Sequence, residues 1–353
     1  MAEPHHSHRW PGVPLAIGSA LLFGASPPLS KMLLTTIDPF MLAGLLYLGA
    51  GIGLAIYKFF RTFSNFSEAE APLTRRDLPW LAMAVGMGGV LGPVLLLFGL
   101  SRISASSGAL LLNVEGLATM GIAWLVFREN VDRRLLAGAA AILAGAVLLT
   151  WDGNGLSLNS GALLVIAACF AWGIDNNFTR KISAADPINI ALIKGLAAGS
   201  VNIAIATLSG SQLPPLPMIA ISAAVGFMAV GVSLVFFILA LRHLGAARTG
   251  AYFSLAPFIG AVLSIALLGE PLTYSLVFAG VLMGIGLWIH LAERHVHEHT
   301  HVELEHEHSH VHDAHHQHRH DTPAAEPHSH SHSHAPLRHA HVHYPDTHHR
   351  HTH

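Results

Sequence analysis

The chain has 353 residues, of which 52% are apolar and only 11% are charged. Soluble domains carry about 25% charged residues, so this composition excludes an ordinary soluble domain and is typical of an integral membrane protein. The formal net charge of −2 gives no electrostatic argument for nucleic-acid binding, and the single cysteine, Cys169, excludes an internal disulfide.

Ten apolar stretches follow one another along the chain, and we interpret each as a membrane span: 11–33, 39–59, 78–100, 104–126, 135–151, 160–182, 187–207, 216–241, 246–268 and 273–292. A span needs about 20 residues to cross about 30 Å of hydrocarbon, and the fifth stretch is short by this measure. All ten are predicted to be helices, because an open strand edge leaves backbone groups unsatisfied in lipid. The first stretch lacks a clear small-x-small cleavage site, so it is predicted to remain as a span.

The first span also begins a repeat. It contains Pro27-Pro28, which are predicted to kink the helix. "FGASPPLSKMLLTTIDPF" at 23–40 resembles "AWGIDNNFTRKISAADPI" at 171–188, and "ASSGALLLNVEGLATMGIAWLVFRENV" at 105–131 resembles "AARTGAYFSLAPFIGAVLSIALLGEPL" at 246–272. Each half holds five spans, and an odd number makes the second copy insert upside down, which is typical of secondary transporters. Chance similarity between apolar segments is the alternative reading.

The predicted fold is therefore all-α and integral to the membrane, with ten transmembrane helices arranged as two inverted five-helix repeats. Thirteen Lys and Arg residues lie in short loops and flanks on one side, against Lys31 and Arg102 on the other, which predicts that both termini are cytoplasmic. The predicted parts are a cytoplasmic N-terminus (1–10), a first repeat (11–151), an inter-repeat loop (152–159), a second repeat (160–293) and a disordered His-rich cytoplasmic tail (294–353).

Glu115 lies near the middle of the fourth span, about eleven residues from either end and roughly 16 Å deep at 1.5 Å per residue. A charged side chain at the centre of a bilayer costs at least about 2.5–3.5 kcal/mol, so its presence needs a reason. Thr119 is one turn further along the same face. One interpretation is a proton or substrate site, and the other is a buried carboxyl that fixes helix packing.

The sixth span ends in polar residues. Asn176 and Asn177 share a helix face with Arg180, and Trp172 lies one turn before them. Amides beside a charge suit the carboxylates or amines of a ligand, so these residues are predicted to contact substrate. Arg180 also serves as an ordinary positive-inside anchor.

Asp175 is predicted to pair with Lys194 of the seventh span. The turn between the two spans centres near Ala185, which brings both side chains to a similar depth in an antiparallel hairpin. Two interpretations stay open here. The pair allows a polar hairpin to insert, or it forms part of the polar wall of a central cavity, with Asp175 kept ionised by Lys194.

The span count, the two halves and a glutamate closing the fourth and ninth spans (Glu129 and Glu270) resemble the drug/metabolite transporter superfamily, EamA type. The resemblance covers about residues 11–292. It implies a carrier of small metabolites in the inner membrane, often an exporter. In one respect the chain departs from the family, since Gly116 stands in the fourth span at the position that Pro257 holds in the ninth. This departure argues against carrying over a substrate from better-known members.

The tail holds 23 of the 28 histidines, counted beyond residue 293. It shows no apolar periodicity and is predicted to be disordered. In an extended chain, alternating imidazoles point the same way and can chelate Zn, Ni, Co or Cu, although no spacing of a closed structural zinc site is present. The candidate metal ligands are His306, His308, His310, His328, His330, His332 and His334.

The leading functional hypothesis is a secondary transporter, not an enzyme, that exports a small organic metabolite or amphiphile, with protons coupled through Glu115. The alternative is a divalent-metal transporter with the tail as sensor or buffer. Its weakness is that, of the histidines before the tail, only His243 and His290 lie near span ends. A membrane scaffold ranks last. The expected partners are the substrate, the bilayer and metal ions on the tail, without nucleic acid. No cofactor is required, and a homodimer is left open.

Overall fold

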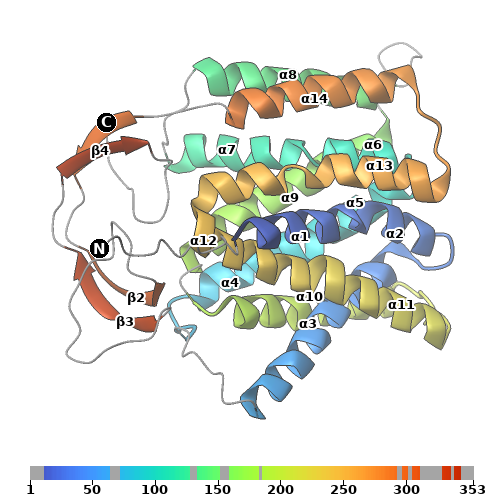
Figure 1. The fold of residues 1–353 in the computed structure, drawn as a ribbon. Helices are drawn as coiled ribbons and strands as arrows, with labels where there is room; N and C mark the ends of the chain where they lie inside the picture. The colour runs from blue at the N-terminus through green and yellow to red at the C-terminus, as the bar shows by residue number, and fades with distance from the viewer. Residues whose placement is uncertain are drawn as a thin grey trace, which may run out of the picture.

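The computed structural model describes residues 12–63, 72–127, 133–151, 159–182, 185–291, 296–300, 304–310, 328–334 and 338–342. Apart from four short strands in the tail, these residues form a bundle of helices that run alongside one another (Figure 1). The predicted all-α membrane fold is therefore confirmed for the body of the chain.

The first half of the body contains α1 (Gly12–Gly24), α2 (Ser26–Leu33), α3 (Pro39–Phe63), α4 (Leu78–Ala84), the π-helix η1 (Val85–Leu91), α5 (Gly92–Leu100), α6 (Ala105–Leu111), α7 (Val114–Phe127) and α8 (Arg133–Thr150). The second half contains α9 (Ser160–Ile182), α10 (Pro187–Leu208), α11 (Leu216–Gly226), the π-helix η2 (Phe227–Val232), α12 (Ser233–Phe253), α13 (Ala256–Leu268) and α14 (Tyr274–Leu291).

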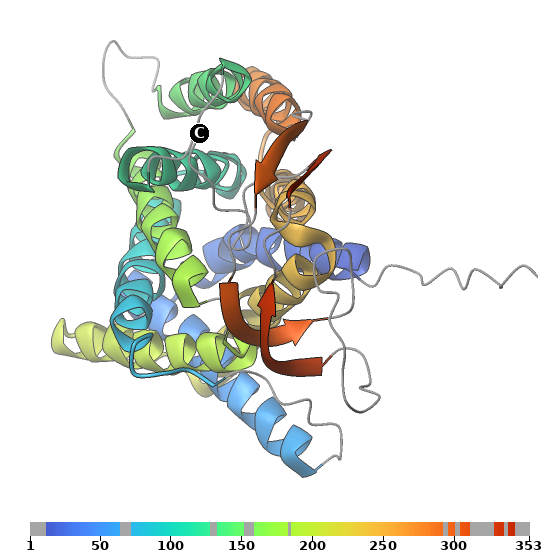
Figure 2. The ribbon, with the colours of Figure 1, turned by 90° about the vertical axis from the view of Figure 1, so that its left-hand side faces the viewer.

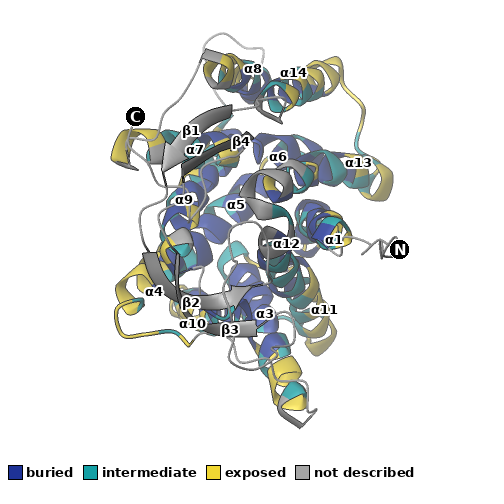
Figure 3. Ribbon diagram, turned by 60° about the vertical axis from the view of Figure 1, so that its left-hand side comes forward, coloured by how far each residue is buried: buried dark blue, intermediate teal, exposed yellow. Residues whose placement is uncertain are grey.

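Seven helical runs are long and apolar enough to cross a membrane: Gly12–Leu33, Pro39–Arg61, Leu78–Leu100, Ala105–Val126, Ser160–Thr179, Pro187–Leu208 and Leu216–Ala240. Three shorter apolar helices, Leu136–Thr150, Ala256–Leu268 and Tyr274–Ile289, accompany them. The count of ten spans stays a prediction. Large apolar side chains such as Leu125, Phe278 and Trp288 are exposed, as expected of a surface that faces lipid. Figure 3 shows exposed residues, in yellow, on helices that include α4 and α14.

Three helical runs are interrupted, and two of the breaks correspond in the repeat. The first run breaks at Ala25, directly before Pro27-Pro28, where a kink was predicted. α6 gives way to α7 at positions 112–113, and α12 gives way to α13 at positions 254–255. At the break between α12 and α13, Pro257 has no N–H to donate to the turn before it. At the break between α6 and α7, the side-chain amide of Asn113 donates to the carbonyl of Leu110 at 2.8 Å.

One predicted boundary is wrong. The eighth and ninth spans were predicted to separate between positions 241 and 246, whereas α12 continues without a break from Ser233 to Phe253. The physical reason is that the polar residues there do not interrupt the helical hydrogen-bond ladder, and the first residue that does so is Pro257.

The two halves pack on each other in corresponding ways. The π-helix η1 packs against α9 and α10, and its counterpart η2 packs against α1 and α3. Close approach at η2 depends on Gly226, because a Cβ there would lie 1.9 Å from the carbonyl oxygen of Leu46. Small residues permit such backbone contact between membrane helices, where the hydrophobic effect does not drive association.

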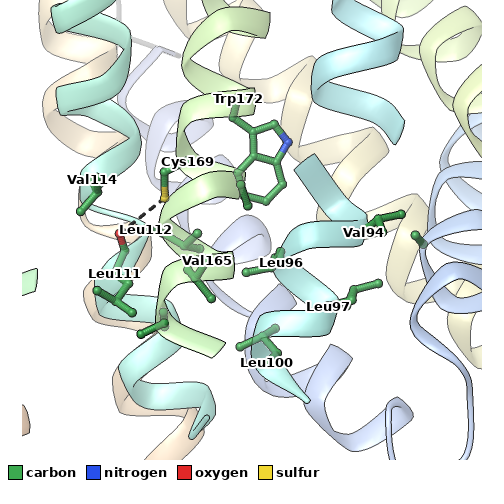
Figure 4. Close-up of a cluster of buried hydrophobic side chains, with 14 of the residues drawn as sticks. Val94, Leu96, Leu97, Leu100, Leu111, Leu112, Val114, Val165, Cys169 and Trp172 are labelled. Carbon is green, nitrogen blue, oxygen red and sulfur yellow. Dashed lines mark hydrogen bonds between the residues drawn. The ribbon is translucent and has the colours of Figure 1, made fainter. Parts of the chain in front are cut away.

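The core beside the candidate site lies between α5, α6 and α9. Figure 4 shows Leu96 of α5 directed toward Val165 of α9, with the thiol of Cys169 directed at the carbonyl of Leu111 at 3.5 Å. This packing fixes α9 against the first half of the chain and so positions the polar residues at its end.

The predicted disorder of the tail is wrong for four segments. β1 (Val296–Thr300) pairs with β4 (Arg338–Val342), and β2 (Leu304–His310) pairs with β3 (His328–His334), both antiparallel. The sequence there alternates His with Ser or Glu, which has the period of a strand, and antiparallel pairing satisfies the backbone without a large apolar core. The rest of the tail lies outside the described residues.

Candidate functional site

A polar cluster joins α7 to α9 in the middle of the bundle. The amide nitrogen of Asn176 donates to the carboxylate of Glu115 at 2.9 Å and to the hydroxyl of Thr119 at 3.1 Å. Thr119 in turn donates to the backbone carbonyl of Glu115 at 3.0 Å. Glu115 stands in the first turn of α7, directly after the break between α6 and α7, and is half-buried, while Asn176 is exposed. The break therefore presents a carboxylate and an amide that a small molecule can reach.

The predicted contact between Asp175 and Lys194 is confirmed as a buried ion pair between α9 and α10. The side chains of Lys194 and Asp175 are only 10% and 6% exposed. The second carboxylate oxygen of Asp175 accepts from Thr179 at 2.9 Å. Two buried charges are tolerated only when paired and hydrogen-bonded, and Asp175 and Lys194 meet both conditions.

The π-helix η1 lies directly on this ion pair. A Cβ at Gly88 would lie 1.8 Å from the carboxylate of Asp175, so only glycine fits at that position. The carbonyl of Gly88 accepts from the hydroxyl of Tyr47 at 2.7 Å and from the indole of Trp172 at 3.0 Å. The carbonyl of Gly89 accepts from the amide of Asn202 at 3.1 Å. π-helical turns occur frequently at functional sites.

The sequence analysis did not single out Tyr47, Gly88 or Asn202 as site residues. The available signal was the run of glycines at 86, 88 and 89 in the third span, which indicates close backbone approach. Trp172 belongs with this group. Its indole turns toward η1, where it donates to the carbonyl of Gly88 and not to Glu115.

Asn177 has a different environment from Asn176. It is buried, and its amide donates to the backbone carbonyls of Gly173 at 2.8 Å and Thr119 at 3.2 Å. Both acceptors are backbone groups, so Asn177 holds α9 against α7.

A row of aromatic rings runs from α9 at this site, through α1, to α12. Trp172 of α9 meets Phe23 of α1 edge-on, with ring centroids 6.4 Å apart. Phe23 is 5.3 Å from Phe253 of α12, which is 4.8 Å from Phe237. The three phenylalanines are half-buried. A polar cluster and an aromatic row therefore lie close together at the point where the two halves meet, a combination that suits amphiphilic molecules.

The side chains of the remaining predicted site residues lie outside the described part of the structure. Arg180 lies in α9, but only its backbone is described. The same holds for the tail histidines, for which the backbone register pairs His306 with His332, His308 with His330 and His310 with His328. Within the described residues, no group of three or more His, Cys, Asp or Glu residues could hold a metal ion.

Comparisons with known proteins agree with this architecture. The profile of the EamA-like transporter family matches the chain twice, over residues 10–151 and 159–292. An "Uncharacterized transporter" from Methanothermobacter thermautotrophicus is 29% identical over 77% of this chain and 84% of its own. A "Probable amino-acid metabolite efflux pump" from Salmonella typhimurium is 25% identical over 78% of this chain and 93% of its own. The "Uncharacterized inner membrane transporter YedA" from Escherichia coli strain K12 is 26% identical over 72% of this chain and 84% of its own.

A solved crystal structure shows the same fold. It superposes with a TM-score of 0.58 over 78% of this chain and 95% of its own, at 18% sequence identity. At this identity the likeness concerns the fold alone.

Proposed function

The chain belongs to the EamA-like transporter family, and we propose that it exports a small organic metabolite or amphiphile by secondary active transport. Membership makes the protein a multi-pass integral membrane transporter. The proposal adds the class of substrate, the direction and the coupling ion. The efflux activity named for the Salmonella typhimurium relative supports the direction.

The observation that carries the proposal is the Glu115–Asn176–Thr119 cluster between α7 and α9. It offers a carboxylate at mid-span, where an ionisable group is costly and therefore functional by default, with an amide and a hydroxyl beside it. The aromatic row beside it offers an apolar surface for the rest of the molecule. A substrate with one polar group and an apolar body fits both features.

Glu115 is the residue that we assign to proton coupling. The other carboxylate of the site, Asp175, is paired with Lys194. Within the described residues, by contrast, the Glu115 side chain hydrogen-bonds to the neutral amide of Asn176. A carboxylate with a neutral partner can take up and release a proton in each transport cycle, whereas one that is locked in an ion pair cannot do so without breaking the pair.

The tail is proposed to bind a transition metal on the cytoplasmic side. The excess of Lys and Arg supports a cytoplasmic position for both termini. The backbone register of β2 and β3, which pairs histidine with histidine, supports this role. Zn, Ni, Co and Cu are the candidate ions, because neutral imidazoles bind them well. Metal titration of the full chain and of a chain ended after residue 293 tests the tail directly.

A substrate-panel thermal-shift screen on the purified protein tests the transport proposal, run with and without Zn and Ni. A ligand that binds the folded state raises the apparent stability by mass action. We expect stabilisation by amphiphilic metabolites that Asn176→Ala abolishes. Stabilisation by metal alone, retained after removal of the tail, would favour the metal-transporter alternative. Proteoliposomes loaded with the best ligand then test whether a proton gradient drives its movement.

A further inference from the structure

Glu270 joins two helices that are far apart in the sequence. It follows the end of α13, where Gly269 adopts a left-handed conformation with φ of 65°. Its two carboxylate oxygens accept from the backbone N–H groups of Ala105, at 2.6 Å, and Ser106, at 2.8 Å. Ala105 and Ser106 are almost completely buried. The carboxylate therefore ties the end of α13 to the start of α6, and both of its hydrogen bonds are of the strong, charge-assisted kind.

Lys31 makes the complementary contact at the same end of the bundle. It lies in the last turn of α2, and its ammonium group donates to the carbonyls of Leu100 and Ile103, the latter at 2.9 Å. A cation from α2 and an anion from the end of α13 thus hold the turn that joins α5 to α6 from two directions. α6 also packs directly against α13 and α2 (Figure 1). We call Lys31 and Glu270 together the latch.

The opposite end of the bundle is arranged differently. There α7 packs along α9, and α1 packs along α12. Within the described residues no comparable packing joins the first pair of helices to the second. Figure 2 views the molecule from this end. The α7–α9 pair and the α1–α12 pair are therefore packed together through α6 and α13 where the latch lies, and less closely at the other end.

The difference between the two ends is also a difference in backbone conformation between corresponding positions of the inverted repeat. In the register of the repeat, positions 105 and 106 correspond to 246 and 247. The chain is broken just before Ala105, and Glu270 takes up the two N–H groups that the break exposes. At 246 and 247 the chain continues inside α12, so no break exists there. Two copies of one fold thus adopt two conformations at the same place.

We propose that Glu270 and Lys31 are gating residues of the transport reaction. The latch closes one end of the bundle, and transport requires Glu270 to release Ala105 and Ser106. Because the two halves share one fold in opposite orientations, an exchange of their conformations produces a molecule open at the other side. In that state the turn at residues 101–104 becomes helical. The segment of α12 that corresponds to it in the repeat is already helical in this structure. The inference rests on the proposed transport function for its purpose, although the conformational change can be observed without any substrate.

Spin-label distance measurements on the detergent-purified or nanodisc-reconstituted full chain test the latch. Cys169 is the only native cysteine, so Cys169→Ser gives a clean background. Arg102→Cys and Leu272→Cys label the latched end, on exposed positions either side of the contact. Ile17→Cys and Leu125→Cys label the opposite end, on exposed positions of α1 and α7. The perturbations are Glu270→Gln and Lys31→Met.

Asp38→Asn is the matched control. Asp38 lies at the same end and its carboxylate also accepts from two backbone N–H groups, those of Phe40 at 2.9 Å and Met41 at 3.4 Å. Those groups belong to its own helix, α3, so the control removes the charge of a helix cap but leaves the latch intact.

We expect Glu270→Gln to raise the population with a long distance at the latched end about tenfold, because a neutral amide replaces a charged acceptor of two hydrogen bonds. The distance at the opposite end should shorten in the same fraction of molecules, and Asp38→Asn should change neither. Lys31→Met should act in the same direction, and it carries the test if Glu270→Gln does not fold. Unchanged distances in both variants would overturn the proposal, and so would opening of the latched end without closure of the other. Failure of the proposed transport function would show separately, as latch opening in a protein that moves no ligand.

Discussion

Breaking the Asp175–Lys194 ion pair should destabilise the protein strongly, and the two single losses should not add. The side chains are 6% and 10% exposed, so whichever partner remains is a buried, uncompensated charge. Loss of one partner of such a pair typically costs about 3–5 kcal/mol. Asp175→Ala strands the ammonium group of Lys194, whereas Lys194→Ala leaves Asp175 with the hydroxyl of Thr179, at 2.9 Å. We therefore expect the first substitution to cost more than the second.

The double variant should recover part of the loss, because it strands no charge. We expect a coupling free energy of about 2–3 kcal/mol between the two positions, at the upper end of the range for residues in contact. Denaturant unfolding of the purified single and double variants measures this value. The control cycle is Lys58→Met with Asn189→Leu. Lys58 contacts Asn189 between α3 and α10 at an exposed position, so its coupling should be no more than about 1 kcal/mol. If the Asp175–Lys194 cycle gave a coupling no larger than this control, the buried ion pair would not exist in the folded protein.

Further predictions concern transport, the two amides, η1 and the tail. Glu115→Gln should abolish the pH dependence of proteoliposome transport between about pH 5.5 and about pH 8.5, because the amide cannot exchange a proton; an unchanged rate and profile would leave Glu115 only a packing role. Asn176→Ala should weaken substrate affinity with little loss of stability, because Asn176 is exposed and water can replace its two hydrogen bonds. Asn177→Ala should lower the unfolding temperature, because its two bonds to backbone carbonyls are buried; thermal-shift assays with and without ligand separate the two, and equal behaviour of both would contradict the assignment. Gly88→Ala should impair folding as much as Asp175→Ala, since the added Cβ lies 1.8 Å from that carboxylate, and a normally stable Gly88→Ala protein would show that η1 moves away freely. Truncation after residue 293 should leave membrane insertion intact, as fractionation and size-exclusion chromatography can show; aggregation on extraction would mean that the tail supports the fold.

Sequence reasoning located part of the candidate site because local geometry determines that part. The Asp175–Lys194 pair follows from counting residues on either side of one tight hairpin, so a nearly regular helix on each side suffices to predict it. The shared face of Glu115 and Thr119 follows from their spacing of four residues. Neither contact depends on how distant helices pack.

Other contacts could not be predicted, because they join helices that no hairpin connects. Asn176 reaches Glu115 only because α7 and α9 pack side by side, and a span separates them in the sequence. Glu270 meets Ala105 and Ser106 across 165 and 164 positions. A pattern of apolar residues says which faces are buried but not which other helix covers each face.

The sequence by itself determined the environment, the helical class and the internal repeat. A composition with few charges requires lipid around the chain, lipid requires helices, and two matching halves with five predicted spans each require inverted copies. The tertiary structure decided which polar residues meet. It set the breaks before α7 and α13, turned Trp172 toward η1 and gave Asn176 and Asn177 different environments. The physical reason is that hydropathy acts on each residue separately, whereas a hydrogen bond between two helices depends on their relative rotation and depth, which only the packing of the whole bundle fixes.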